Sequence, residues 1–197
     1  EGSNANKAIN LWFKNNRFAG STDKFLIRDI IFSSLRRKKS SFLIFGKFGL
    51  PKNSRSIIIY TLFELGYDLS QYFTSSKYGP TRLSLLEKKA LISKKETLEY
   101  AKDFDIFDYP PFLENEFKKS LGVLYESFFE FSKIRAPLFI RINQIKSSLN
   151  EVQSSLICCN IETKKIPGFK NSLVVLSNQR KIKNTISYNS GFFEIQD

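Results

Sequence analysis

The stretch Ala136-Pro-Leu-Phe-Ile-Arg-Ile-Asn-Gln-Ile-Lys146 marks a change in the structure that the sequence predicts. Before it, apolar residues recur at the spacing of helices, whereas short β-rich runs separated by Ser, Asn and Gly follow it. Pro137 donates no backbone hydrogen bond and disfavours helical geometry at Ala136, so we expect a helix to end by Arg135 and a strand to run from Leu138 to Ile142. We therefore predict a domain boundary at Ala136.

The composition is that of a folded and strongly basic protein. The 197 residues are 42% hydrophobic and 15% aromatic, enough for one large core or two small ones. The net charge is +12, and the part from residue 136 onward is basic like the part before it. Such an excess indicates a polyanionic partner, most often nucleic acid or an anionic membrane surface, with an incidental lysine-rich composition as the alternative.

Several kinds of site are excluded by what the sequence lacks. No apolar run reaches the roughly 18 to 20 residues of a membrane span, so no membrane-spanning segment is expected. We also expect no membrane among the partners. There is no histidine for a Cys/His zinc site, and the acids from Asp103 to Asp108 lack the Gly and distal Glu of a calcium loop, so we expect a solvated loop and no metal. Cys158 and Cys159 are adjacent and cannot form the disulfide framework of a secreted protein, which favours the cytoplasm. Both are expected to be partly buried.

Residues 1–135 are predicted to form a bundle of about seven helices. The helix from Arg55 to Leu65, capped by Ser54, is apolar on nearly every side and should lie at the centre. Other helices are predicted for Ala5 to Phe13, for a segment starting at Ser21 or Thr22, for the segments capped by Ser84 with Glu87 and by Ser93 with Glu96, and for Phe112 to Leu121 and Val123 to Ile134.

A run of four cations, Arg36, Arg37, Lys38 and Lys39, closes the second predicted helix. Cations near the C-terminal end of a helix are favoured by its dipole, and the run spans more than one turn, so its members cannot share one face. The run is either a phosphate-facing patch or an ordinary solvated helix end.

Residues 136–190 are predicted to form a small α+β domain of the ferredoxin-like or RRM-like kind. Its short helix begins after Ser148 and runs from Leu149 to Leu156. The predicted strands are Leu138 to Ile142, Cys159 to Lys164, Leu173 to Leu176 and Phe192 to Gln196. The whole chain is therefore expected to be mainly α, with a small α+β part.

Two segments resemble the RsmB/Nop/Sun-type RNA cytosine-5 methyltransferases. Arg141-Ile-Asn143-x-x-Lys146 is similar to an Arg-Val-Asn-x-x-Lys segment that opens a small domain in that family. Gly191-Phe-Phe-Glu-Ile-Gln-Asp197 is similar to a Gly-x-Phe-x-Val-Gln-Asp signature that leads into the cofactor-binding fold. Each segment departs from the family by Ile in place of Val.

The first half of the chain shows the same resemblance. The segment from Asp23-Lys-Phe25 to Leu35-Arg-Arg37 is similar to a segment of the NusB-like helical domain that precedes many bacterial members. The stretch from Pro110 to Gly122 is similar to their Pro-x-Trp-Leu…Phe-Gly stretch, with Phe replacing Trp. The resemblance thus implies a NusB-like domain over 1–135, the small domain over 136–190, and the start of a truncated Rossmann-like methyltransferase domain over 191–197.

The resemblance implies a ribosomal RNA methyltransferase that uses S-adenosylmethionine as its cofactor. The family's catalytic cysteines lie in Pro-Cys and Thr-Cys motifs that Cys158 and Cys159 do not match, so no catalytic or cofactor-binding residue is assigned here. The chain also has no Met and stops abruptly at Asp197, which we interpret as a fragment that binds no cofactor and is inactive alone.

The expected partner is structured RNA, ribosomal RNA above all, bound by a monomeric chain. Candidate contacts with the RNA are the four cations from Arg36 to Lys39 together with Arg141, Asn143 and Lys146. Alternatively, Arg141 packs the small domain against the catalytic domain that the resemblance implies. Two other functions stay open. One is a free-standing NusB-like RNA-binding or antitermination factor, and the other is a structural helical adaptor whose charge is incidental.

Overall fold

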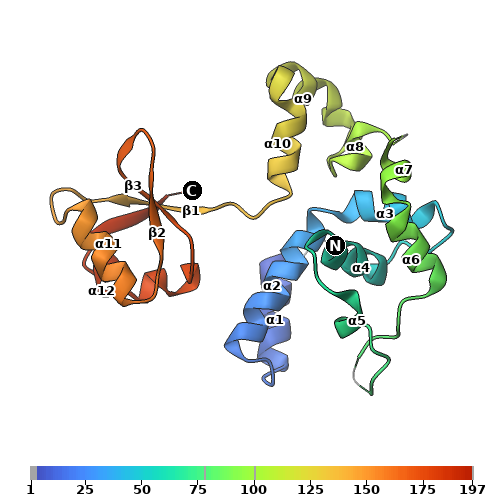
Figure 1. The fold of residues 1–197 in the computed structure, drawn as a ribbon, viewed down its shortest axis with the longest axis horizontal. Helices are drawn as coiled ribbons and strands as arrows, with labels where there is room; N and C mark the ends of the chain where they lie inside the picture. Colours follow the sequence, from blue (N-terminus) through green and yellow to red (C-terminus); the bar gives the residue numbers. More distant parts are fainter. Residues whose placement is uncertain (1–3, 78, 100, 197) are drawn as a thin grey trace. The chain divides into compact units, whose positions relative to one another are not determined.

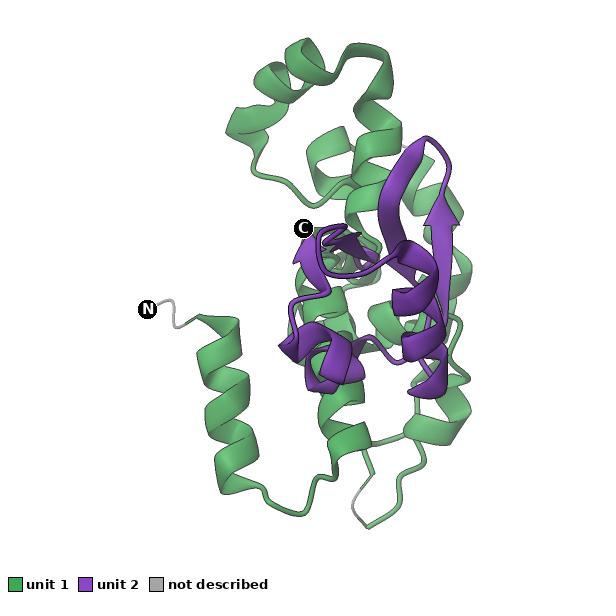
Figure 2. Cartoon of the chain, turned by 90° about the vertical axis from the view of Figure 1, so that its left-hand side faces the viewer, with its two compact units in different colours: residues 1–134 green, residues 135–197 purple. Residues whose placement is uncertain are grey.

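The computed structural model describes residues 4–77, 79–99 and 101–196 (Figure 1). The chain divides into two compact units, residues 1–134 and residues 135–197 (Figure 2). The first is helical, and the second combines helices with a four-stranded sheet. The predicted fold class, mainly α with a small α+β part, is confirmed. No helix within the described ranges is long and apolar enough to cross a membrane.

The helical unit has more helices than the sequence predicts, because short helices fill segments that were expected to be loops. Its described residues form α1 (Ala5–Asn15), α2 (Ser21–Leu35), α3 (Lys38–Gly46), α4 (Ser54–Glu64), α5 (Leu69–Tyr72), α6 (Leu85–Ile92), α7 (Lys94–Glu99), α8 (Asp103–Ile106), α9 (Glu114–Leu121) and α10 (Tyr125–Ser132). Two 3-10 turns, η1 (Pro111–Leu113) and η2 (Gly122–Leu124), precede α9 and α10.

Helix α4 lies in the larger core of the helical unit, as predicted. Ile59 and Thr61 have no exposed surface, and their neighbours Tyr60 and Leu62 are buried as well. Asn53 is the N-cap in place of the predicted Ser54, because its side-chain oxygen accepts a hydrogen bond from the backbone N–H of Ser56 at 3.1 Å. Helices α2 and α3 both pack on α4.

A second, aromatic core joins α8, α9 and α10. Tyr109, Tyr125 and Phe129 are buried at its centre, and the hydroxyls of the two tyrosines are hydrogen-bonded to each other. Phe104 and Phe107 from the segment of α8 pack against this cluster. The prediction of a solvated loop from Asp103 to Asp108 is therefore wrong, since aromatic burial makes this segment helical.

The small unit is a sheet with its helices on one face. In chain order it contains β1 (Leu138–Ile142), α11 (Leu149–Cys158), β2 (Thr163–Ile166), β3 (Phe169–Val175), the 3-10 helix η3 (Gln179–Asn184), α12 (Ile186–Asn189) and β4 (Phe193–Gln196). All described strand pairs are antiparallel, in the order β2-β3-β1-β4. This order, with helices after β1 and after β3, is the ferredoxin-like arrangement.

Alternation along the strands separates a buried face from an open one. Ile140 and Ile142 of β1 join Phe193 of β4 in a core that is closed by residues of α11 and η3. Phe139 and Arg141 lie on the opposite face, because successive strand residues point to opposite sides. The open face therefore carries the residues that alternate with the core.

Three sequence predictions for the small unit are corrected. The resemblance implies that residues 191–197 start a following domain, but Phe193–Gln196 form β4 of this sheet, close to the strand predicted over Phe192 to Gln196, and Phe193 fills its core; Asp197 lies outside the described residues. The second strand was predicted over Cys159 to Lys164, but α11 continues to Cys158 and β2 begins at Thr163. Both cysteines are exposed, not partly buried.

Candidate nucleic-acid interface

The four cations from Arg36 to Lys39 span a break between two helices and not the end of one. Helix α2 ends at Leu35 and α3 begins at Lys38, which places Lys38 and Lys39 in the first turn of α3. The positive end of a helix dipole disfavours cations there, so the dipole argument that the sequence suggested for these two lysines is wrong.

Asp108, distant in sequence, compensates for the unfavourable start of α3. Its carboxylate accepts hydrogen bonds from the backbone N–H of Lys39 at 2.5 Å, from the backbone N–H of Ser40 at 3.1 Å and from the Ser40 hydroxyl at 2.7 Å. Asp108 adopts a φ of 62°, a left-handed conformation that Asp tolerates better than most residues. Burial raises the pKa of Asp108, although the hydrogen bonds from Ser40 and Lys39 oppose the rise.

The cations of this junction differ in how far they reach the surface. Arg37 is only 8% exposed and donates from Nη1 to the carbonyl of Ser33 at 3.1 Å, so its placement in a phosphate-facing patch is wrong. Lys39 donates from Nζ to the carbonyl of Tyr109 at 2.8 Å and is half-buried. Arg36 is also half-buried, and Lys38 is exposed. Of these four cations, Lys38 is the most exposed.

The candidates in the small unit lie where β1 meets β4. Arg141 is paired with Glu194 in the strand register, and its Nη2 donates to Oε2 of that glutamate at 2.8 Å. Both side chains are more than half exposed, at 59% and 65%. Exposed ion pairs of this kind contribute about 0.2–1 kcal/mol, so the pair is a modest link between the strands.

Asn143 and Lys146 join the turn after β1 to the turn before β4. The backbone N–H of Asn143 donates to the carbonyl of Phe192 at 2.8 Å, and its side-chain amide donates to the carbonyl of Gly191 at 3.3 Å. The Nζ of Lys146 donates to the carbonyl of Ser190 at 3.0 Å. Both residues therefore have hydrogen-bond partners within the unit. The Lys146 ammonium is exposed and has three N–H donors, so it can also donate a hydrogen bond to an anion.

The β2–β3 hairpin is a basic surface that the sequence analysis did not single out. Its turn contains Pro167 and Gly168, with a φ of 82° at the glycine. Exposed Lys164, Lys165 and Lys170 flank this turn, and Phe169 is 65% exposed. The missed signal is the interleaving of lysines with an aromatic residue around Pro-Gly, a combination that suits phosphates and unstacked bases.

Chemically reactive groups are sparse in both units. Cys158 and Cys159 are free thiols at the end of α11, and no hydrogen bond to either sulfur is formed by the described side chains. Within residues 4–77, 79–99 and 101–196, no three His, Cys, Asp or Glu side chains gather as a metal site requires.

The fold has a counterpart among solved structures. The crystal structure of PH0851 is similar over 93% of this chain, with a TM-score of 0.54 and 15% sequence identity. The likeness therefore extends over both units, and at this identity it shows the fold alone. This chain spans 46% of the length of that protein. No family model matches the chain, and no curated protein matches it in sequence.

Proposed function

We propose that this chain is the RNA-recognition part of an S-adenosylmethionine-dependent ribosomal RNA (cytosine-5) methyltransferase. The observation that carries the proposal is the meeting of the two segments that resemble that family. Asn143 and Gly191 are 48 residues apart in sequence, yet they are hydrogen-bonded where β1 and β4 pair. Motifs that resembled a family by chance would have no reason to meet, so their pairing supports the resemblance.

The likeness to PH0851 supports the same proposal at the level of architecture. It covers the helical unit and the sheet of the small unit together, and the matched protein is about twice as long as this chain. A free-standing helical RNA-binding factor would not need the sheet. The proposal accordingly assigns RNA binding to this chain and methyl transfer to a further domain of the whole protein.

The groups described here fit RNA binding better than methyl transfer. Attack on a pyrimidine requires an activated thiolate, and the exposed Cys158 and Cys159 have no hydrogen-bonding base among the described residues. No glycine-rich loop of the dinucleotide-binding or phosphate-binding kind is present to hold a cofactor. We therefore assign the S-adenosylmethionine site to the whole protein, and we propose a monomeric, cytoplasmic chain that binds neither cofactor nor metal by itself.

The proposed phosphate contacts are the exposed cations: Lys38 in the helical unit, and Lys146 and the three lysines of the β2–β3 hairpin in the small unit. Arg37 is left out because it is buried. Phosphate contacts of this kind give affinity without sequence preference, so they would orient a folded RNA and leave the choice of base to the catalytic pocket.

The test is RNA binding by the whole 197-residue chain across a salt series. We expect the logarithm of affinity to fall linearly with the logarithm of salt concentration, with a slope of about −0.9 for each duplex phosphate contacted. Replacing Lys164, Lys165 and Lys170 with Gln should lower both affinity and slope. The matched control replaces three exposed lysines of the helical unit, Lys7, Lys14 and Lys95, with Gln and should change both less.

Two results would overturn the proposal. Absence of binding to structured ribosomal RNA fragments even at low salt would favour a structural adaptor. Tight binding of S-adenosylmethionine, measured by calorimetry on the same chain, would show that the assignment of the cofactor site to another domain is wrong.

A further inference from the structure

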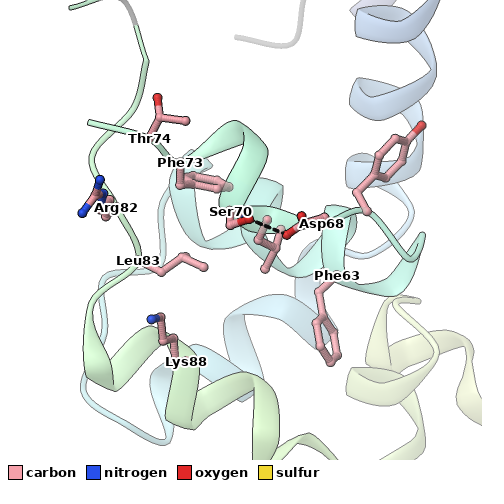
Figure 3. A pocket seen from close by; sticks show the side chains of 10 residues that line it. Phe63, Asp68, Ser70, Phe73, Thr74, Arg82, Leu83 and Lys88 are labelled. Carbon is pink, nitrogen blue, oxygen red and sulfur yellow. Dashed lines mark hydrogen bonds between the residues drawn. The ribbon is translucent and has the colours of Figure 1, made fainter. Parts of the chain in front are cut away.

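A cleft in the helical unit has the size and lining of a small-ligand site (Figure 3). Its volume is about 620 Å³, inside the range of roughly 300–1,000 Å³ that ligand sites occupy. The end of α4, helix α5, the segment that leads into α6 and the first turn of α6 form its walls. Phe73 and Leu83 connect its floor to the larger core of the unit.

The two sides of the cleft carry opposite charge. Arg82 and Lys88 lie on one side and Asp68 on the other, with Leu83 pointing between them (Figure 3). Both cations are exposed, and within the described part of the chain neither side chain has a hydrogen bond or ion pair. The cationic side is therefore available to an anion.

Asp68 presents an ionised carboxylate with an acceptor position to spare. It caps α5 by accepting at Oδ1 from the Ser70 backbone N–H at 3.0 Å and from the Ser70 hydroxyl at 2.7 Å. These hydrogen bonds hold the pKa of Asp68 below its usual range. Its Oδ2 accepts only from the Gln71 side chain at 3.2 Å among the described residues, and a carboxylate oxygen has room for a second donor.

An aromatic ring lies on the same side of the cleft as Asp68. Phe63, near the end of α4, is 40% exposed and lines the cleft, with its ring directed away from the Asp68 carboxylate (Figure 3). Exposed aromatic rings are the usual stacking surfaces for unpaired bases. The cleft thus combines a stacking surface, an acceptor for an amino group and, across the apolar Leu83, two cations.

We propose that this cleft binds one unstacked nucleotide of the RNA. The phosphate lies between Arg82 and Lys88, the base stacks on Phe63, and an exocyclic amino group of the base donates to Asp68. The choice of RNA as the source of the nucleotide rests on the proposed function. An acidic peptide would also suit the two cations, but a further carboxylate at the other side would meet the charge of Asp68, so the cleft favours a nucleotide.

The direct test titrates the whole chain with cytidine monophosphate, uridine monophosphate and cytidine, followed by NMR chemical shifts. Cytosine offers an amino group where uracil has a carbonyl oxygen, so we expect cytidine monophosphate to bind several-fold more tightly than uridine monophosphate. It should also bind roughly tenfold more tightly than cytidine, because charge-assisted hydrogen bonds to the phosphate are strong.

Three variants assign the two sides of the cleft. Asp68→Asn keeps a side-chain cap for α5 but adds a donor, and it should abolish or reverse the preference for cytidine monophosphate over uridine monophosphate. Arg82→Gln combined with Lys88→Gln should reduce binding of cytidine monophosphate to the level of cytidine. Lys89→Gln, an exposed neighbour on α6 that does not line the cleft, is the matched control and should change nothing.

The outcomes separate this inference from the proposed function. Equal binding of both nucleotides, binding unaffected by these variants, or a glutamate-rich peptide that displaces cytidine monophosphate would overturn the inference. If none of the nucleotides binds while the chain retains salt-dependent binding of structured RNA, the inference fails and the proposed function stands. If the nucleotides bind as described but structured RNA does not bind, the proposed function fails and the nucleotide site stands.

Discussion

The two units use their candidate RNA-binding cations in different ways. At the break between α2 and α3, Arg37 and Lys39 are directed at carbonyl groups of their own unit. Where β1 meets β4, Arg141 and Lys146 also have protein partners, but both side chains are exposed. A run of cations at a helix break must first satisfy local packing, whereas cations on a strand and a turn keep contact with water. Their substitutions should therefore differ in how much stability they cost.

The largest expected effect is that of Arg37→Gln in the helical unit. The change removes the packing of a buried side chain and leaves the carbonyl of Ser33 without its hydrogen bond, so we expect the free energy of unfolding to fall by about 2–3 kcal/mol. Urea denaturation followed by circular dichroism measures this loss. Lys38→Gln, at the adjacent exposed position, should stay within about 0.5 kcal/mol. Similar losses of stability for both variants would show that the buried and the exposed cation contribute equally to the fold.

The next effect comes from Asp108, which holds the start of α3. Asp108→Ala removes all three hydrogen bonds and leaves alanine at a φ of 62°, so we expect a loss of about 1–3 kcal/mol. Asp108→Asn should lose less than half as much, because the amide oxygen still accepts and Asn tolerates the left-handed conformation. If both variants were equally destabilised in urea, the charge of Asp108 and not its hydrogen bonds would hold the junction.

The pH dependence of the same junction follows from the raised pKa of Asp108, which burial causes. The folded state holds this proton more tightly than the unfolded state. The contribution of Asp108 to stability therefore grows as pH falls through the folded pKa and is complete below the unfolded pKa of about 3.9. We expect the wild type to gain stability relative to Asp108→Asn between pH 7 and pH 4, measured by urea denaturation at each pH. A difference that did not vary with pH would mean that the hydrogen bonds cancel the effect of burial.

The smallest expected effect is the coupling between Arg141 and Glu194 in the small unit. Both side chains are more than half exposed, so a double-mutant cycle with Arg141→Gln and Glu194→Gln should give about 0.2–1 kcal/mol. The coupling should decline as salt is added, because solvent ions screen exposed charges. A coupling above 2 kcal/mol at physiological salt would show that Arg141, like the buried Arg37, contributes substantially to the stability of the fold.

Local chemistry explains which parts of the fold could be predicted. Ser84 with Glu87 forms the predicted capping box at the start of α6, and Ser148 caps α11 as predicted, where Glu151 completes a second capping box. The strand Leu138–Ile142 follows from Pro137 and from alternation, and it was predicted to the residue. Each of these signals lies within a few residues of the element that it starts.

The missed parts depend on contacts between residues far apart in sequence. Helix α3 has no side-chain cap of its own and begins where Asp108, 69 residues from Lys39, accepts its first N–H groups. Glu194 becomes the partner of Arg141 only through the pairing of β1 with β4. The sequence analysis selected the two signature segments of the small unit but could not give the strand register that joins them.

The position of β1 between β3 and β4 has a consequence for synthesis on the ribosome. Both neighbours of β1 come later in the chain, since Leu138 pairs with Val175 and Phe139 pairs with Gln196. As the polypeptide emerges from the ribosome, the backbone N–H and C=O groups of β1 have no strand partner until β3 and then β4 have left the exit tunnel. Most helices of the first unit form from local contacts and need no such delay, although α3 must wait for Asp108. The nascent small unit is therefore the part of the chain most exposed to aggregation, and it has the greater need of a chaperone.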